Sequence, residues 1–399
     1  KNRIIQILRK INIHNLKSEK IDISKSLGRI LSKDISSPIN LPPFNNSAVD
    51  GFALHKSDIS KVKKLKIKYR VAAGDKKKVQ LRIGEVARIF TGAKMPENSS
   101  TVVMQENTIF DNSKVKLLKL PSFGENCRKL GEDIKKNKYV LRSGEAISKT
   151  NISLLAAVGQ KTIFVKKKIK IGFFTSGNEL KDPSDKIKNS QIYNSNKYTL
   201  LSLLKNESLV TKYLGTLKDT KKKVFKKLNN NINKFSVIIT TGGASVGEED
   251  HLVKFIKEKG KLFFWKIAIK PGRPLAIGKV KNTIIICLPG NPVSVFLLFG
   301  MLIKPFLLSL CGSNFKIPKS YKGKCNFEMK KKTARMEWLR VKTEKNAGKD
   351  IILNKFSRQG SGIISSISYA DGIIEIPENV NRIKKGDIFD VYFFENLFN

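Results

Sequence analysis

Cysteine is scarce in this chain of 399 residues. Only four are present, at Cys127, Cys287, Cys311 and Cys325, and no two of them form a CxxC pair. This spacing argues against a disulfide framework and against a cysteine zinc site, and it predicts a cytoplasmic protein.

Long apolar runs and a secretory signal are also missing. The longest apolar stretch, 293–303, is interrupted by Ser294 and Gly300 and is too short to cross a bilayer. Residues 1–10 alternate charge with Ile and Leu and lack an apolar core followed by a cleavage site. The sequence therefore predicts no membrane association.

Acidic residues are the third shortage. There are 33 Asp and Glu against 77 Lys and Arg, which gives a formal net charge of +44. Such a balance is typical of proteins that bind nucleic acids or other anions. The lysines, however, are spread through every region, without the interleaved aromatic residues that a base-stacking surface needs. We interpret most of the excess of lysine as a bias of overall amino-acid composition, carried by solvent-exposed surfaces, and we expect no specific nucleic-acid partner.

The chain does contain enough apolar material for several cores, since 40% of its residues are hydrophobic. Its length predicts roughly two to four domains, and no repeat with a period of about 20–50 residues is present. Four regions differ in texture. Residues 1–28 and 131–165 hold helical and extended segments that we expect to pack together, 29–130 is mainly β, 166–312 is α/β, and 313–399 suits a small β barrel or sandwich.

The α/β region alternates short apolar runs with amphipathic segments. The runs predict strands at 169–174, 209–214, 236–240 and 283–288, and the segments between them predict helices at 195–204, 220–228 and 249–259, with another opening at Pro292. This order is typical of a mostly parallel sheet covered on both faces. Ligands of such sheets bind beyond the carboxyl ends of the strands.

Two of these strands run into turns that suit a phosphate group. The strand at 236–240 is followed by TGGASVGEED and a helix, and the strand at 283–288 is followed by PGNPVS, with Asn291 as the helix N-cap. Glycines let backbone N–H groups approach an anion, and a helix N-terminus adds partial positive charge. A tight turn also needs glycine, so each turn alone is weak evidence.

A third strand end, TSGNEL at 175–180, and the segment FWKIAIKPGRP at 264–274 complete the predicted crevice. If 265–270 is a strand, Lys266 and Lys270 point to one face and indicate an anion there, unless they are two solvated edge lysines. Glu179 and Asp250 lie where metal or proton chemistry would occur, although isolated acids are more often surface residues.

The ordered combination of motifs resembles one family. PPFNNSAVDGFA, RIFTGAKMP, VVMQE, GEDI, TSGNEL, TTGGASVGEED, FWKIAIKPGRP and LPGNPVS follow one another as in the MoeA family of molybdopterin molybdenumtransferases, which is related to the E domains of gephyrin and of the plant molybdenum-insertion protein. The resemblance covers about residues 3–395. It implies an elongated N-terminal part, an inserted β domain, a doubly wound molybdopterin-binding α/β domain and a C-terminal β barrel, in a homodimer whose inserted domain completes the partner's cleft.

The reaction implied by this resemblance is insertion of molybdate into the dithiolene of adenylylated molybdopterin, with release of AMP and with the aid of Mg²⁺. It also implies a molybdopterin adenylyltransferase as the partner that supplies the substrate. Matching by motif gives the following catalytic residues: Asp50, Thr91, Glu179, Asp219, Asp250, Lys266 and Lys270, of which Asp50, Glu179 and Asp250 are the candidate metal ligands. The candidate binding residues for the pterin and the oxyanion are Thr175, Gly177, Gly242, Gly243, Ser245, Gly247, Pro289, Gly290, Asn291, Arg340 and Ser361.

Several positions depart from the family pattern. Asn45 and Asn178 stand where an acid is usual, and Arg273 stands where a lysine is usual. Since Asp50 and Glu179 are kept, we expect activity with altered metal affinity. Two other functions stay open at this point: a gephyrin-like scaffold that binds a partner's peptide, and nucleic-acid binding through charge alone.

Overall fold

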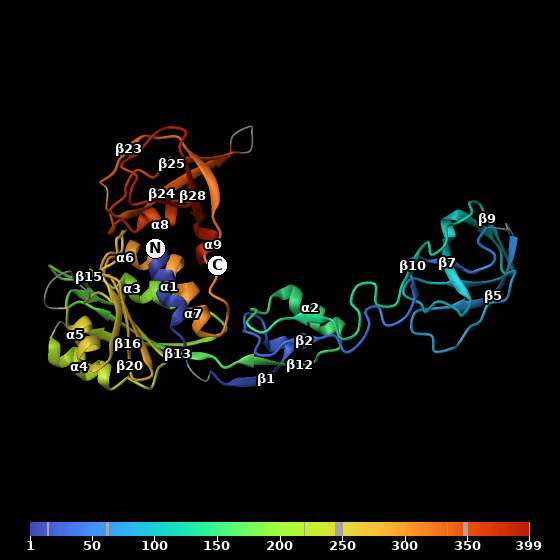
Figure 1. The fold of residues 1–399 in the computed structure, drawn as a ribbon, viewed down its shortest axis with the longest axis horizontal. Coiled ribbons are helices and arrows are strands. Elements are labelled where there is room, and N and C mark those ends of the chain that lie inside the picture. Colours follow the sequence, from blue (N-terminus) through green and yellow to red (C-terminus); the bar gives the residue numbers. More distant parts are fainter. Residues whose placement is uncertain are drawn as a thin grey trace.

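The computed structural model describes residues 1–13, 16–60, 64–218, 220–243, 250–332, 334–345 and 350–398. The molecule is elongated (Figure 1). An α/β body with a barrel on top lies at one end, and a separate β domain lies at the other end. The slender part between them holds β1 (Ser18–Asp22), β2 (Ile35–Ser36), β12 (Thr162–Lys166) and α2 (Lys149–Ala157).

The α/β body is built on a six-stranded sheet in the order β16-β13-β17-β21-β20-β18. The first four strands are parallel, and β20 and β18 are antiparallel additions at one edge. Near-continuous Ile and Val runs form the inner strands because both faces are covered. The strands are β13 (Ile169–Ser176), β16 (Leu209–Leu217), β17 (Val237–Thr241), β18 (Lys261–Trp265), β20 (Ala276–Val280) and β21 (Thr283–Leu288).

Helices cover both faces of this sheet and create two hydrophobic cores. One core lies under α4 (Lys221–Asn229) and α5 (His251–Lys259). The other lies under α1 (Asn2–Lys10), α3 (Ser195–Leu203) and a long helix at 292–310. Between β13 and α3 the chain forms a two-stranded finger from β14 (Leu180–Lys181) and β15 (Ile192–Tyr193). The predicted fold class, a mostly parallel α/β sheet accompanied by β domains, is confirmed.

The long helix consists of α6 (Pro292–Leu298), a π-helical turn (Phe299–Ile303) and α7 (Lys304–Leu310). It continues well beyond the apolar stretch at 293–303 and is long and apolar enough to cross a membrane by composition alone. Most of it is buried inside the fold, with 78% of its most apolar window covered. We therefore assign it as a core helix.

The N-terminal helix α1 (Asn2–Lys10) joins the α/β body. Its Ile5 and Leu8 are buried in the core that contains the long helix, and α1 contacts α7. The helix α2 (Lys149–Ala157) packs instead with the small core around Leu155 in the middle part, where β1 (Ser18–Asp22) pairs with β12 (Thr162–Lys166) and β2 (Ile35–Ser36) pairs with β11 (Tyr139–Leu141). The expectation that the segment 131–165 packs beside α1 is wrong, because α1 packs on α7 instead, and from the N-terminal region it is β1 that pairs with β12.

The β domain at the far end is a six-stranded sheet in the order β7-β4-β6-β5-β9-β8. Its strands are β4 (Gly51–His55), β5 (Lys64–Val71), β6 (Glu85–Ile89), β7 (Ser99–Met104), β8 (Thr108–Phe110) and β9 (Lys114–Leu117). A second ladder, β3 (Asn46–Ser47) with β10 (Cys127–Arg128), ties its entry and exit strands together. Because both connections leave from the same place, this domain is an insertion into the middle part.

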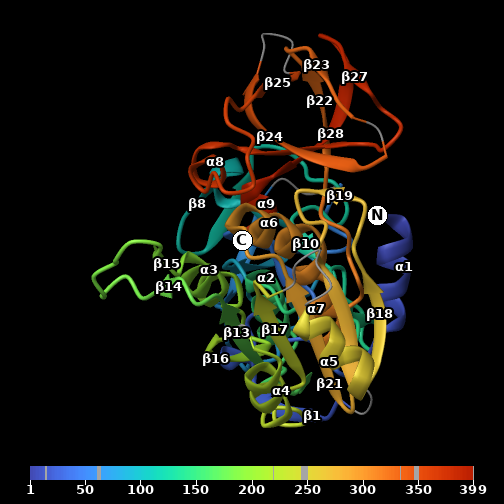
Figure 2. The same cartoon turned by 90° about the vertical axis from the view of Figure 1, so that its left-hand side faces the viewer.

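The C-terminal region closes into a five-stranded barrel, since β24 pairs with both β25 and β26. The barrel consists of β22 (Tyr321–Cys325), β24 (Met336–Lys345), β25 (Ile351–Lys355), β26 (Gly372–Ile376) and β28 (Ile388–Phe393), with β23 (Met329–Lys330), β27 (Arg382–Ile383), α8 (Ser365–Tyr369) and α9 (Phe394–Phe398) around it. The short strand β19 (Ile269–Lys270) leaves the α/β body and pairs with β24. Figure 2 shows the barrel above the sheet, with α6 and α8 at the junction.

Candidate active site

Three parallel strands of the sheet end side by side and bring their turns together. The N–H of Gly242, after β17, donates to the carbonyl of Leu288 at the end of β21, at 3.1 Å. Gly242 has φ +77°, and a Cβ on it would lie 2.5 Å from the carbonyl oxygen of Ser176 at the end of β13. A Cβ on Gly290 would in turn lie 3.5 Å from the Cα of Gly242. Only glycine fits at Gly242, because both the backbone conformation and the space exclude a side chain.

Polar side chains hydrogen-bond to these turns and strand ends from within the protein. Asn196 donates from Nδ2 to the carbonyl of Gly290 at 2.7 Å, while its Oδ1 is buried and has no partner. Thr175 is fully buried, and its Oγ1 lies 2.9 Å from both Nδ2 of Asn194 and the hydroxyl of Tyr213. The Thr175 hydroxyl is thus satisfied within the protein, so it orients the strand end rather than facing a ligand.

A cavity of about 480 Å³ opens beside these turns, between the α/β body and the barrel. Five residues that the sequence assigned to binding or catalysis line it: Lys270, Pro289, Asn291, Arg340 and Ser361. Lys270 arrives on β19 and Arg340 on β24, and the N–H of Val293 at the start of α6 donates to the carbonyl of Ser361 at 3.3 Å. The barrel and the α/β body therefore share this cavity.

The charges around the cavity are strongly unbalanced. Lys270, Arg273, Arg335 and Arg340 line it against a single carboxylate, Glu337, which pairs with Lys270 at 2.9 Å. Sequence reasoning did not assign Arg273, Arg335 or Glu337. Arg273 was visible as a departure from the family pattern, whereas nothing in the sequence singles out the other two. An arrangement of this kind attracts a multiply charged anion.

Arg340 is the most deeply placed of these cations, with 1% of its surface exposed. Burial lowers the pKa of its guanidinium from 12.5 to about 10. Its Nη2 donates to the carbonyl of Gly360 at 3.1 Å, and its Nε is buried without a partner. Gln359, which sequence reasoning missed, accepts from the Arg340 N–H and donates to the Arg340 carbonyl, at 3.0 and 2.8 Å. Gln359 thus fixes the backbone of Arg340, while the Nε of the guanidinium remains without a hydrogen-bond partner.

The predicted acids Glu179 and Asp250 are not among the residues that line this cavity. Asp250 is 3% exposed and caps α5, where Oδ1 accepts from the N–H groups of Leu252 and Val253 at 3.2 and 3.0 Å. Burial raises its pKa against these hydrogen bonds, and its Oδ2 has no partner. Glu179 is exposed, with its carboxylate folded back over Gly177. Among the described residues, no three His, Cys, Asp or Glu side chains gather as metal ligands.

Lys266 does not share a face with Lys270. Strand β18 ends at Trp265, Lys266 has φ +63°, and β19 belongs to the barrel sheet. The predicted alternation through 265–270 is therefore wrong, because a left-handed residue breaks the pleat between two strands of different sheets. The Nζ of Lys266 lies 4.1 Å from the centre of the Trp265 ring, and its charge opposes the rise in the pKa of Asp250.

Asp50 and Thr91 lie in the far β domain, remote from the cavity in the same chain (Figure 1). Thr91 donates to Asp50 Oδ1 through both its N–H and its hydroxyl, at 2.7 Å each, and these bonds lower the pKa of Asp50. Asn45, which replaces an acid, accepts from the N–H of Leu130 at 2.7 Å, so its carboxamide has a structural partner. Three further predicted residues, Asp219, Ser245 and Gly247, lie outside the described residues.

The chain matches three family models in order along its length. They are described as the MoeA N-terminal region (domain I and II), over residues 2–159, a probable molybdopterin binding domain, over 172–309, and the MoeA C-terminal region (domain IV), over 322–394. Together they span nearly all of the sequence.

Full-length relatives agree with these matches. A molybdopterin molybdenumtransferase of Haemophilus influenzae is 31% identical over 382 residues, covering 95% of both chains. A putative molybdopterin biosynthesis protein of Methanocaldococcus jannaschii is 32% identical, covering 96% of this chain and 93% of the relative. The crystal structure of a molybdopterin biosynthesis MoeA protein from Pyrococcus horikoshii superimposes with a TM-score of 0.83 at 26% identity over 98% of each chain. The chain belongs to the MoeA family of molybdopterin molybdenumtransferases, enzymes of molybdenum cofactor biosynthesis.

Proposed function

We propose that this enzyme inserts molybdate into the dithiolene of adenylylated molybdopterin and releases AMP. The observation that carries the proposal is the cavity between sheet and barrel, where four cations face one carboxylate. Both substrates are anionic, and charge develops on the leaving phosphate during the reaction. Preorganised cations and N–H groups stabilise such charge strongly when water is excluded.

The roles follow from the placement of each group. The turns at Gly242 and Gly290 suit the phosphate side of the substrate, because their backbone approaches closely without side chains. Arg340, Lys270 and Ser361 suit the oxyanion, since all three line the cavity and Lys270 can exchange Glu337 for a stronger anion. In this assignment molybdate and the pterin meet across the interface of the α/β body and the barrel.

We also propose Mg²⁺ as the metal cofactor. This ion is commonly held by one or two carboxylates together with substrate phosphates. The unpartnered Oδ2 of Asp250 fits such a shared site, with Glu179 as a second carboxylate from the neighbouring strand end. When bound, Mg²⁺ would supply neutralising charge at the pyrophosphate. Asp250 itself would orient the start of α5 through its two backbone hydrogen bonds.

The position of Asp50 supports a dimeric enzyme. Within one chain the far β domain lies at the opposite end of the molecule from the cavity (Figure 1), so Asp50 and Thr91 would act only in the cleft of a second copy. We propose a homodimer in which each inserted domain completes the partner's site. A molybdopterin adenylyltransferase would supply the substrate.

The test is release of AMP from adenylylated molybdopterin in the presence of molybdate and Mg²⁺, measured by chromatography. We expect Arg340→Met to slow turnover by about a hundredfold or more, as for loss of one preorganised oxyanion donor. Arg382→Met is the matched control, because Arg382 lies on the same barrel but pairs with the exposed Glu328. Wild-type protein that leaves the substrate unchanged would contradict the proposal.

A further inference from the structure

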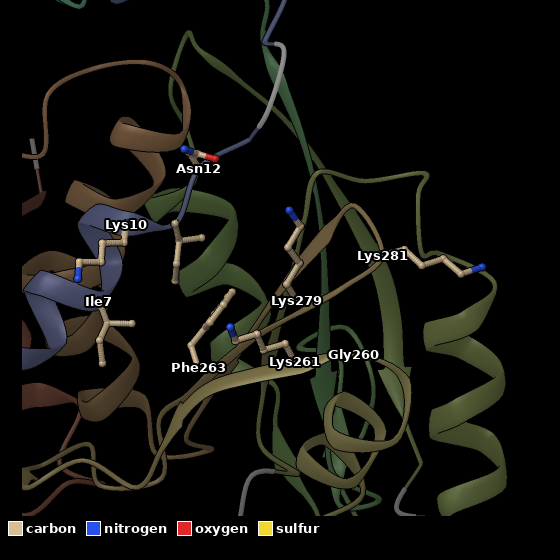
Figure 3. Close-up of a pocket in the computed structure, with 9 residues that line it drawn as sticks. Ile7, Lys10, Asn12, Gly260, Lys261, Phe263, Lys279 and Lys281 are labelled. Atoms are coloured by element: carbon tan, nitrogen blue, oxygen red, sulfur yellow. The ribbon is translucent and has the colours of Figure 1, made fainter.

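A second cavity, of about 640 Å³, lies between α1 and the strands β18 and β20 (Figure 3). It shares no lining residue with the cavity of the candidate active site. Lys261 of β18 pairs with Lys279 of β20, at the end of this ladder opposite Trp265, which pairs with Ala276. The second cavity therefore lies at the amino ends of the parallel strands, away from the turns at Gly242 and Gly290.

The walls of this cavity carry four lysines and no acid: Lys10, Lys261, Lys279 and Lys281. None of the four takes part in an ion pair among the residues that the structure describes. Lys261 and Lys279 stand directly opposite each other in the antiparallel register, where like charges destabilise a sheet. Lys281 has φ +50° in a two-residue turn, a conformation that a lysine adopts only at a cost.

Opposed lysines alone do not make a site in so basic a chain. Lys64 and Lys116 also face each other, across β5 and β9 of the inserted domain, and both are exposed. What distinguishes the second cavity is its apolar wall. Ile7 and Ile11 of α1 and Phe263 of β18 line the same space as the lysines, and Ile11 is 8% exposed.

The volume and the mixed lining are those of a small-molecule pocket, for which about 300–1,000 Å³ is usual. Apolar side chains on one wall bind a hydrophobic body, while the lysines need at least two negative groups to balance them. We propose that this cavity binds a small organic anion that carries two or more phosphate, sulfonate or carboxylate groups on an apolar body.

Binding is tested with pyranine, a fluorescent aromatic trisulfonate, by anisotropy titration of the full chain at about 0.15 M salt, where distant charges are screened. We expect the variant K261Q/K279Q to bind about ten- to thirtyfold more weakly, since each lysine next to a sulfonate contributes a Coulomb energy of about tenfold in affinity or less. K10Q/K281Q should show a similar loss. The matched control K64Q/K116Q should stay within about twofold of the wild type.

Four results would overturn the proposal. The first is equal weakening in the control, which would mean general attraction to a basic chain. The second is competition by pyrophosphate at the same concentration as pyranine, because the apolar wall would then contribute nothing. The third is tighter binding of hexaglutamate through the same lysines, which would assign the surface to an acidic peptide beside the edge strand β18. The fourth is the absence of saturable pyranine binding to the wild type.

Discussion

Replacing Arg340 by methionine should leave the fold at least as stable as before while removing its response to molybdate. The Arg340 guanidinium is buried, makes one hydrogen bond to the Gly360 carbonyl and leaves Nε without a partner. The neighbouring carboxylate of Glu337 forms its ion pair with Lys270 instead. Arg340 is therefore a buried cation that the protein compensates only in part, through the charge of Glu337.

The size of this effect follows from the lowered pKa of Arg340. A fall from 12.5 to about 10 corresponds to roughly 3 kcal/mol against the folded state. Access of water through the cavity reduces this to about 2 kcal/mol. Because the folded pKa is the lower one, the penalty is present at every pH below about 10 and shrinks above it. Methionine leaves the Gly360 carbonyl without its donor, which costs about 1 kcal/mol.

The expected net change is a gain of about 1 kcal/mol in the free energy of unfolding, with a higher midpoint in differential scanning calorimetry. Molybdate should raise the midpoint of the wild type, by the equivalent of about 2.7 kcal/mol at a hundred times its Kd, and should leave the variant unchanged. Arg382→Met should keep the molybdate response. Destabilisation of Arg340→Met by more than about 2 kcal/mol would show that the guanidinium holds the fold together, and would refute the reasoning.

Three further predictions test other parts of the structure. A mixture of Asp50→Ala and Arg340→Met chains, unfolded and refolded together, should recover about a quarter of the wild-type AMP release. The reason is that half of the dimers would be mixed, and one of the two sites in each mixed dimer would be intact. No recovery would contradict the shared cleft. Thr91→Val should raise the pKa of Asp50 toward its ordinary value, seen by carboxyl NMR titration, since one of two donors to Oδ1 is lost; an unchanged pKa would mean that the hydroxyl bond is absent in solution. Gly242→Ala should lower the free energy of unfolding by about 2 kcal/mol or more, because its Cβ would lie 2.5 Å from a carbonyl oxygen. The control Gly84→Ala has a similar φ and open space around the new Cβ, so it should cost about 1 kcal/mol. Equal losses in the two variants would disprove the steric argument.

Much of the fold was predictable where local pattern and tertiary environment agree. The inner strands at 169–174, 236–240 and 283–288 were found because buried parallel strands are apolar runs bounded by glycine or polar turns. The strand β20, which lies between β21 and the edge strand β18, was not predicted, since Gly278 and Lys279 interrupt its apolar pattern. Of the long helix only the start at Pro292 was predicted, since Gly300 interrupts the apolar stretch and glycine normally weakens a helix. Here the ring of Phe398 packs over Gly300, where a Cβ would be only 2.9 Å away.

The candidate site was also predictable only in part. Lys270, Asn291 and Arg340 could be named from motifs, and the structure places all three around one cavity. The motifs do not contain the contacts between them. Two examples are the hydrogen bonds of Gln359 to the Arg340 backbone and the ion pair of Glu337 with Lys270. Both depend on strand register in the barrel, which a single sequence does not determine.

The long helix at 292–310 has a consequence for the newly made polypeptide. It is covered from two sides by α1 and by α9, where Phe398 packs on Phe296 with ring centres 5.5 Å apart. During translation α1 leaves the ribosome long before this helix, but α9 leaves it only after the barrel. During that interval the nascent chain exposes one side of an apolar helix that is long enough to span a bilayer. Chaperones that shield such segments should therefore engage this chain during barrel synthesis and release it once α9 has docked.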